Sequence, residues 1–175
     1  MFYSVIRGVP LQDGSMMRIH ARTKHTYIYA VDVVEWDVYP QYKQDLEDVT
    51  TNFASLLRNN PFINGVVHHN GIVHNSHYYP INPVLEQYTI HNGLNPPPVL
   101  QPNLILIFGI HTEFCVIDHA ESLSQQFPKS QILILYDLCK TKHGEKGDYF
   151  LFNYCMRSKN IDCVDSNYLM IINED

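Results

Sequence analysis

Cys115 lies where the sequence changes from an apolar strand to a helix, a position at which a cysteine can act as a nucleophile. The apolar run 104–107 predicts a buried strand. An apolar face at helical spacing follows it, formed by Val116, Ala120 and Leu123. Thr112 is a good helix N-cap, which would place Cys115 near the third helical position. There the helix dipole and free backbone N–H groups would lower the pKa of the thiol. The alternative interpretation of Cys115 is a small buried apolar side chain.

The histidine-rich segment 68–77 is a second group of residues that could do chemistry. Imidazole nitrogens are ligands for zinc and iron, and a metal with open coordination positions can be catalytic. One hypothesis is therefore a zinc or iron site on His69, His74 and His77. The other is a polar loop whose histidines bind backbone groups, since the adjacent His68 and His69 would point to opposite faces of an extended chain.

The elements that must position these residues alternate between strands and helices. Strands are expected at 27–34, 62–68, 85–91, 103–110, 130–137 and 162–164, and helices at 42–58, 112–126 and 148–158. Solvated loops are expected at 69–83 and 138–147. The alternation predicts an α/β fold, a doubly wound parallel sheet in a Rossmann-like three-layer arrangement. Right-handed crossovers then place the site at the C-terminal ends of the strands. We expect residues 1–25 to be an N-terminal extension and 26–175 the domain.

Composition narrows the class of protein. The chain has 175 residues, 45% hydrophobic and 17% charged, which predicts one extensively buried domain and a homo-oligomer interface. A formal net charge of −6 argues against nucleic acid as the partner. The chain has no apolar run that predicts a membrane span and no signal peptide, and its four cysteines form no CxxC pair. These features predict reduced thiols and a cytoplasmic location, without membrane contact.

The spacing Gly109-x-x-Thr112-x-x-Cys115-Val116 resembles the nucleophile turn of the isochorismatase-like cysteine hydrolases, a family that includes the nicotinamidases. The likeness is good over about residues 103–170 and partial over 27–60. It implies the isochorismatase-like form of the doubly wound fold. It also implies a hydrolase that cleaves an amide or related C–N bond of a small molecule through a thioester on Cys115.

The resemblance assigns a role to each matching residue. Cys115 would be the nucleophile, and Asp32, at the end of the first predicted strand, would take its proton and later activate water. The backbone N–H groups of His111 and Cys115 would form an oxyanion hole, next to a cis peptide bond between Ile110 and His111. No cofactor is required for this chemistry.

The family's catalytic lysine has no counterpart here, because no lysine lies between Lys43 and Lys129. His91 stands in the matching neighbourhood and, when protonated, could separate the charges of the carboxylate and the thiolate. Three hypotheses therefore stay open. They are a cysteine hydrolase, an inactive protein of this fold that binds a ligand or a protein partner, and a metal-dependent hydrolase that uses the histidine cluster.

Trp36 and Tyr39 follow soon after Asp32 and are candidates for an aromatic substrate pocket. The alternative is that both rings take part in ordinary packing between a strand and the next helix.

Overall fold

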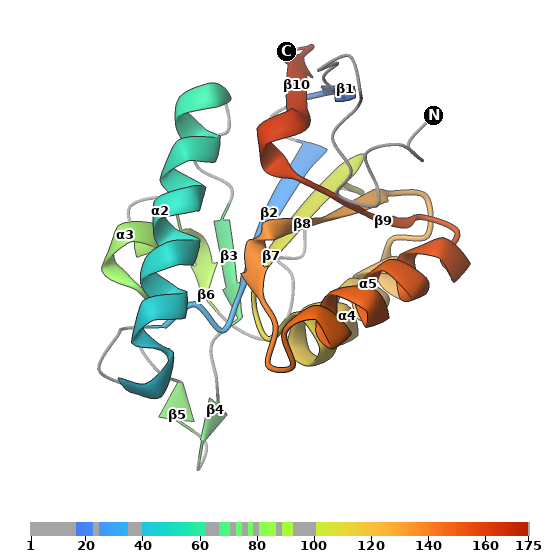
Figure 1. Ribbon diagram of the computed structural model, residues 1–175. Coiled ribbons are helices and arrows are strands. Elements are labelled where there is room, and N and C mark those ends of the chain that lie inside the picture. The colour runs from blue at the N-terminus through green and yellow to red at the C-terminus, as the bar shows by residue number, and fades with distance from the viewer. Residues whose placement is uncertain are drawn as a thin grey trace.

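A six-stranded parallel sheet forms the middle layer of the molecule, with strand order β6-β3-β2-β7-β8-β9 (Figure 1). Its strands are β2 (Thr26–Val31), β3 (Val67–Asn70), β6 (Thr89–Asn92), β7 (Leu104–Ile110), β8 (Gln131–Lys140) and β9 (Ile161–Val164). The structure, a computed structural model, describes residues 17–22, 25–34, 40–61, 67–70, 73–74, 77–78, 81–86, 89–92 and 101–174. All neighbouring strands of this sheet run parallel.

Helices cover both faces of the sheet. α2 (Lys43–Asn59) lies on one side, and α4 (Ile117–Gln126) and α5 (Glu145–Arg157) lie on the other (Figure 1). The three-layer, doubly wound α/β fold expected from the alternating pattern is therefore confirmed. The sheet needs cover on both faces because every residue in its central strands β2 and β7 is buried, and most of these residues are apolar.

The apolar face of each helix explains how it packs. On α2 the buried side chains include Leu46, Val49 and Phe53, at helical spacing. Phe53 stacks on Phe108 of β7 with ring centroids 4.9 Å apart, which joins α2 directly to the middle of the sheet. On the opposite side Val116, Ala120 and Leu123 are buried, as their spacing predicts.

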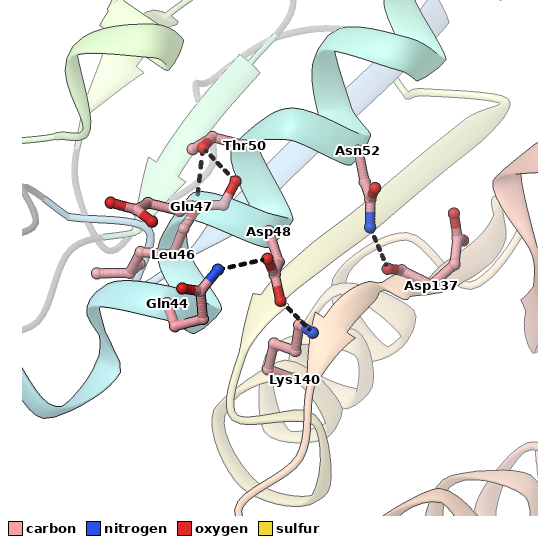
Figure 2. Close-up of polar contacts among 8 residues, drawn as sticks. All are labelled: Gln44, Leu46, Glu47, Asp48, Thr50, Asn52, Asp137 and Lys140. Atoms are coloured by element: carbon pink, nitrogen blue, oxygen red, sulfur yellow. Dashed lines mark hydrogen bonds and ion pairs between the residues drawn. The ribbon is translucent and has the colours of Figure 1, made fainter.

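Polar contacts also hold α2 against β8 (Figure 2). Lys140 Nζ lies 2.9 Å from Asp48 Oδ2, and Gln44 donates to the other oxygen of Asp48 at 2.9 Å. Further along the helix, Asn52 donates a hydrogen bond to the backbone carbonyl of Asp137 at 3.1 Å. The prediction that the loop begins at residue 138 is wrong, because pairing with β7 and these contacts extend β8 to Lys140.

The segment between β3 and β6 differs from the expectation. The predicted strand at 85–91 is divided into the short helix α3 (Pro83–Glu86) and β6. Asn82 explains the division, because its Oδ1 accepts the backbone N–H of Val84 and so caps α3, with Pro83 at the first helical position. The predicted loop 69–83 contains a short antiparallel pair, β4 (Val73–His74) and β5 (His77–Tyr78).

The described part of the expected N-terminal extension takes part in the fold. β1 (Met17–Ala21) pairs in parallel with β10 (Leu169–Asn173) to form a second, two-stranded sheet. Two short 3-10 turns complete the description, η2 (Pro40–Tyr42) and η4 (Ser166–Tyr168). Among the described residues, no helix combines the length and apolar character that crossing a membrane requires.

Candidate active site

Two neighbouring strands end at the candidate site. Val31, the last residue of β2, is in register with Gly109 of β7. A Cβ on Gly109 would lie 2.0 Å from the carbonyl oxygen of Val31, and the φ of Gly109 is +138°, so both space and backbone conformation require glycine there. Asp32 follows Val31 with φ of +56°, in the left-handed region that Asp tolerates better than most residues. The two strand ends therefore meet at very close range.

The turn after β7 carries the cysteine. The peptide bond between Ile110 and His111 is cis, as the resemblance implied. The π-helical turn η3 (Thr112–Val116) follows and leads directly into α4. The carbonyl oxygen of His111 accepts the N–H groups of Phe114 and Val116, both at 3.2 Å. Cys115 thus lies in the first turn of the helical segment, as predicted.

Thr112 is not the N-cap that the sequence predicted. His111 occupies the cap position in an extended conformation, and Thr112 is the first residue of the π turn, with its side chain buried. The reason is the wider π turn, whose five-residue bond from Val116 to His111 moves the start of the helix back by one residue.

Asp32 and Cys115 contact each other across the two strand ends. Their side chains form a hydrogen bond, in which the thiol donates to the carboxylate. Asp32 is 8% exposed, and burial raises its pKa to about 6 although the bond from Cys115 lowers it. The predicted partnership of the acidic residue and the cysteine is thus present as a direct contact.

The prediction that the helix terminus lowers the pKa of the Cys115 thiol is wrong. Burial raises this pKa to about 11, and the charge of Asp32 and the hydrogen bond to it act in the same direction. The backbone N–H of His111 donates to the sulfur and lowers the pKa, but its effect is smaller. Desolvation and the adjacent carboxylate outweigh the dipole, so at neutral pH the proton resides on sulfur and the negative charge on Asp32.

The ring of His111 lies at the N-terminal end of α2. It contacts the ring of Tyr42 edge-on, with centroids 4.7 Å apart. Burial lowers the pKa of His111, so its imidazole is neutral at physiological pH. His111 therefore contributes a backbone N–H on the side of Cys115 and an uncharged ring on the side of α2.

Glu113 joins the turn η3 to the segment that follows β8, a role that the sequence did not suggest. Its buried Oε1 accepts the backbone N–H groups of Lys142 and His143, both at 2.8 Å, and lies 2.9 Å from Nδ1 of His143. Gly147 lies against the same carboxyl group, since a Cβ there would be 3.1 Å from Glu113 Cδ. The sequence offers one signal for this role, an acidic residue in the first helical turn. It does not show which loop that residue contacts.

In the segment 138–147, expected to be a solvated loop, residues 142–146 are exposed, but side-chain contacts hold the segment in place. Lys140 pairs with Asp48 of α2, and residues 142–143 bind Glu113. Nearby, Asp137 accepts hydrogen bonds from the N–H and the hydroxyl group of Ser166, while burial raises its pKa to about 6. Asp137 therefore connects β8 to the turn η4.

Several predicted site residues lie outside the described residues. Trp36 and Tyr39 are among them, as are the side chains of His69, His74, His77 and His91. The backbone register places His91 opposite His68, which in turn pairs with Tyr29, and it pairs His74 with His77. Among the described side chains, no group of three His, Cys, Asp or Glu residues is arranged to hold a metal ion.

Comparisons with solved structures identify the fold. A MAR1 ribonuclease from Caenorhabditis elegans is similar over 86% of this chain and 80% of its own, with a TM-score of 0.60 and 13% identity. An isochorismatase-like hydrolase from Alkaliphilus metalliredigens is similar over 83% and 96%, with a TM-score of 0.58 and 12% identity. A MAR1 ribonuclease homologue from Leishmania major is similar over 86% and 83%, with a TM-score of 0.57 and 13% identity.

No protein-family model matches the sequence, and no curated protein matches it significantly. The likeness is therefore one of structure at low sequence identity. The protein has the three-layer α/β fold of the isochorismatase-like hydrolases.

Proposed function

We propose that the protein is a nicotinamidase-like cysteine hydrolase that cleaves an amide or related C–N bond of a small molecule. The observation that carries the proposal is the hydrogen bond between Cys115 and Asp32, because it joins a nucleophile to a base of suitable pKa. A carboxyl group with a pKa of about 6 is ionised at neutral pH and can still release its proton readily to a leaving group.

The reaction would proceed through a thioester. The sulfur of Cys115 attacks the substrate carbonyl carbon while the thiol proton passes to Asp32. The C–N bond then breaks, and the leaving amine takes that proton. Asp32 next accepts a proton from water, which attacks the thioester carbon; the acid product leaves, and the proton returns to sulfur. The backbone N–H groups of His111 and Cys115 would stabilise the negative oxygen of each tetrahedral intermediate.

A small-molecule substrate is favoured over RNA, although three of the similar structures are of MAR1 ribonucleases or their homologues. The net charge of −6 would repel a phosphate backbone, and a negative Asp32 beside the nucleophile would repel the phosphate at the reaction centre. We also propose a reducing compartment, such as the cytoplasm, because the mechanism needs Cys115 as a free thiol.

The test is amide hydrolysis by purified protein, measured as ammonia or amine release from a panel of small carboxamides and N-carbamoyl compounds. Cys115→Ala should lower kcat/KM about a thousandfold or more, and Asp32→Asn about a hundredfold or more. Asp118→Asn is the matched control, since Asp118 raises the pKa of the Cys115 thiol through its charge alone. It should keep nearly full activity. Activity that survives in Cys115→Ala would refute the mechanism.

The second candidate function is binding without catalysis. The observation that favours it is the thiol pKa of about 11, which makes the free thiolate rare at neutral pH. Wild-type protein that hydrolyses no member of the panel, yet is stabilised against heat by one of them, would support this candidate over the hydrolase.

Metal-dependent hydrolysis through His69, His74 and His77 stays a separate prediction. Stoichiometric zinc or iron in purified protein, with activity that survives Cys115→Ala and is lost after chelation, would support it.

A further inference from the structure

Large apolar side chains are exposed on the outer side of α5 and beside it. On α5, Tyr149 is 68% exposed, Phe150 55% and Met156 58%. Phe114, the residue before Cys115, is 47% exposed and lines a groove of about 270 Å³ together with Phe150. The helix turns Leu151 and Cys155 inward, so Tyr149 and Met156, seven residues apart, lie along one outward stripe.

The exposed apolar area of these four side chains is comparable to the largest apolar patch of a typical monomer, which is often a functional surface. At about 200 Å² for each large side chain, the four exposed fractions correspond to roughly 450 Å². A patch of that size is typical of an interaction surface, and it supplies about half of the roughly 800 Å² that each partner buries in a stable complex. The polar residues around it would supply the remainder.

Charges along α5 favour a second copy of the chain as the partner. The first turn carries Glu145 and Asp148, whereas Arg157 ends the helix and Lys159 follows it. Lys146 lies in the first turn as well, but it lines the groove beside Phe114. A second α5 laid antiparallel on the first would place the acidic end of each helix against the basic end of the other. The two helix dipoles would then also oppose each other favourably.

We propose that a second copy of this chain covers the surface, with α5 packed antiparallel on α5 about a two-fold axis near Phe152 and Asn153. An interface about a two-fold axis is isologous, so the same self-complementary patch of each subunit forms it. Tyr149 and Met156 lie at equal distances from that axis in sequence, so Tyr149 packs against Met156 of the partner subunit and the reverse. The inference is independent of the proposed hydrolase activity.

The dimer would also affect the nucleophile turn. Gly147 of α5 contacts Glu113, and Phe114 shares the groove with Phe150, so η3 and α5 form one continuous surface. Packing of a second copy over this surface removes the ring of Phe114 from water and restrains the residue next to Cys115.

Sedimentation equilibrium of the purified full chain tests the proposal. Wild-type protein should have twice the 20.3 kDa mass of the chain at micromolar concentration. Tyr149→Ser and Met156→Ser should each raise the dimer dissociation constant about tenfold or more, because they remove central apolar contacts. Met170→Ser is the matched control, an exposed methionine on β10, and should leave the constant unchanged. Circular dichroism confirms that each variant is folded.

A charge exchange tests the antiparallel orientation. Glu145→Lys and Arg157→Glu should each weaken self-association, since each places like charges at both ends of the pair. An equimolar mixture of the two variants should restore the dimer, because each basic end then meets an acidic end. A wild-type monomer would overturn the proposal. So would a dimer that Tyr149→Ser leaves intact, or a mixture no tighter than either variant alone.

Discussion

The Cys115 thiol donates a hydrogen bond to the Asp32 carboxylate across the ends of two adjacent parallel strands. Burial, and to a lesser degree the carboxylate, raises the pKa of the Cys115 thiol to about 11; burial raises the pKa of Asp32 to about 6, although the bond from the thiol lowers it. At neutral pH the thiol of Cys115 is therefore protonated and the carboxylate of Asp32 carries the negative charge. In the proposed hydrolysis, attack by the sulfur would require the proton to move along this bond.

Asp32→Asn should make Cys115 more reactive toward iodoacetamide. The substitution removes a negative charge and a hydrogen bond that both raise the thiol pKa, whereas the effect of burial remains. Alkylation at pH 8, followed by mass spectrometry of the peptide that contains Cys115, should accelerate roughly tenfold for each unit by which the pKa falls. An unchanged or slower rate would show that Asp32 does not control the thiol. Asp118→Asn, which removes a charge with a smaller effect on the thiol pKa, should give a smaller increase.

Asp32→Asn should also stabilise the fold at high pH. The folded pKa of about 6 exceeds the unfolded value of 3.8, so ionisation of Asp32 opposes folding. That cost is absent below pH 3.8, grows between pH 3.8 and 6, and is complete above pH 6, where it amounts to at most about 3 kcal/mol. Urea unfolding should show a more stable variant at pH 8 and equal stability near pH 3.5. A variant less stable than wild type at pH 8 would contradict the burial of an ionised Asp32.

Gly109→Ala should disrupt the junction of β2 and β7. A Cβ would lie 2.0 Å from the backbone of Val31, which cannot move without displacing Asp32. We expect the free energy of unfolding to fall by more than about 4 kcal/mol, or the protein to be insoluble. Gly144→Ala is the matched control, because its φ is +56° but no atom lies within 4 Å of the added carbon. It should cost only about 1–3 kcal/mol, from backbone strain alone. Equal effects of the two substitutions in chemical denaturation would argue against the close contact.

Glu113→Ala should loosen the segment around His143. The substitution leaves two backbone N–H groups without their acceptor, which costs about 2–4 kcal/mol in unfolding free energy. Glu113→Gln keeps an oxygen acceptor and should lose less. Hydrogen exchange of the amides of Lys142 and His143 should accelerate in Glu113→Ala, while Glu121→Ala, on exposed surface, should change neither stability nor exchange. Unaltered hydrogen exchange in Glu113→Ala would show that Glu113 does not hold this segment in place.

The sequence by itself determined the central strands of the sheet and the position of Cys115. Apolar runs long enough to be buried on both faces predicted β2 and β7, and helical spacing predicted the buried face that begins at Val116, because both patterns depend on local periodicity. The segment that holds α3 and β6 was harder to predict from the sequence, because Asn82 and Pro83 start a helix next to residues that read as a strand.

Only the tertiary structure decided the electrostatics of the site. Local rules placed Cys115 at a helix terminus and predicted a low thiol pKa, but the sequence could not show that Asp32 lies in hydrogen-bond contact or how far both groups are buried. Nor could it show that Glu113 meets the loop after β8, almost thirty residues away along the chain. Desolvation and charge contacts depend on distances between segments remote in sequence, whereas strand and helix patterns depend on neighbours.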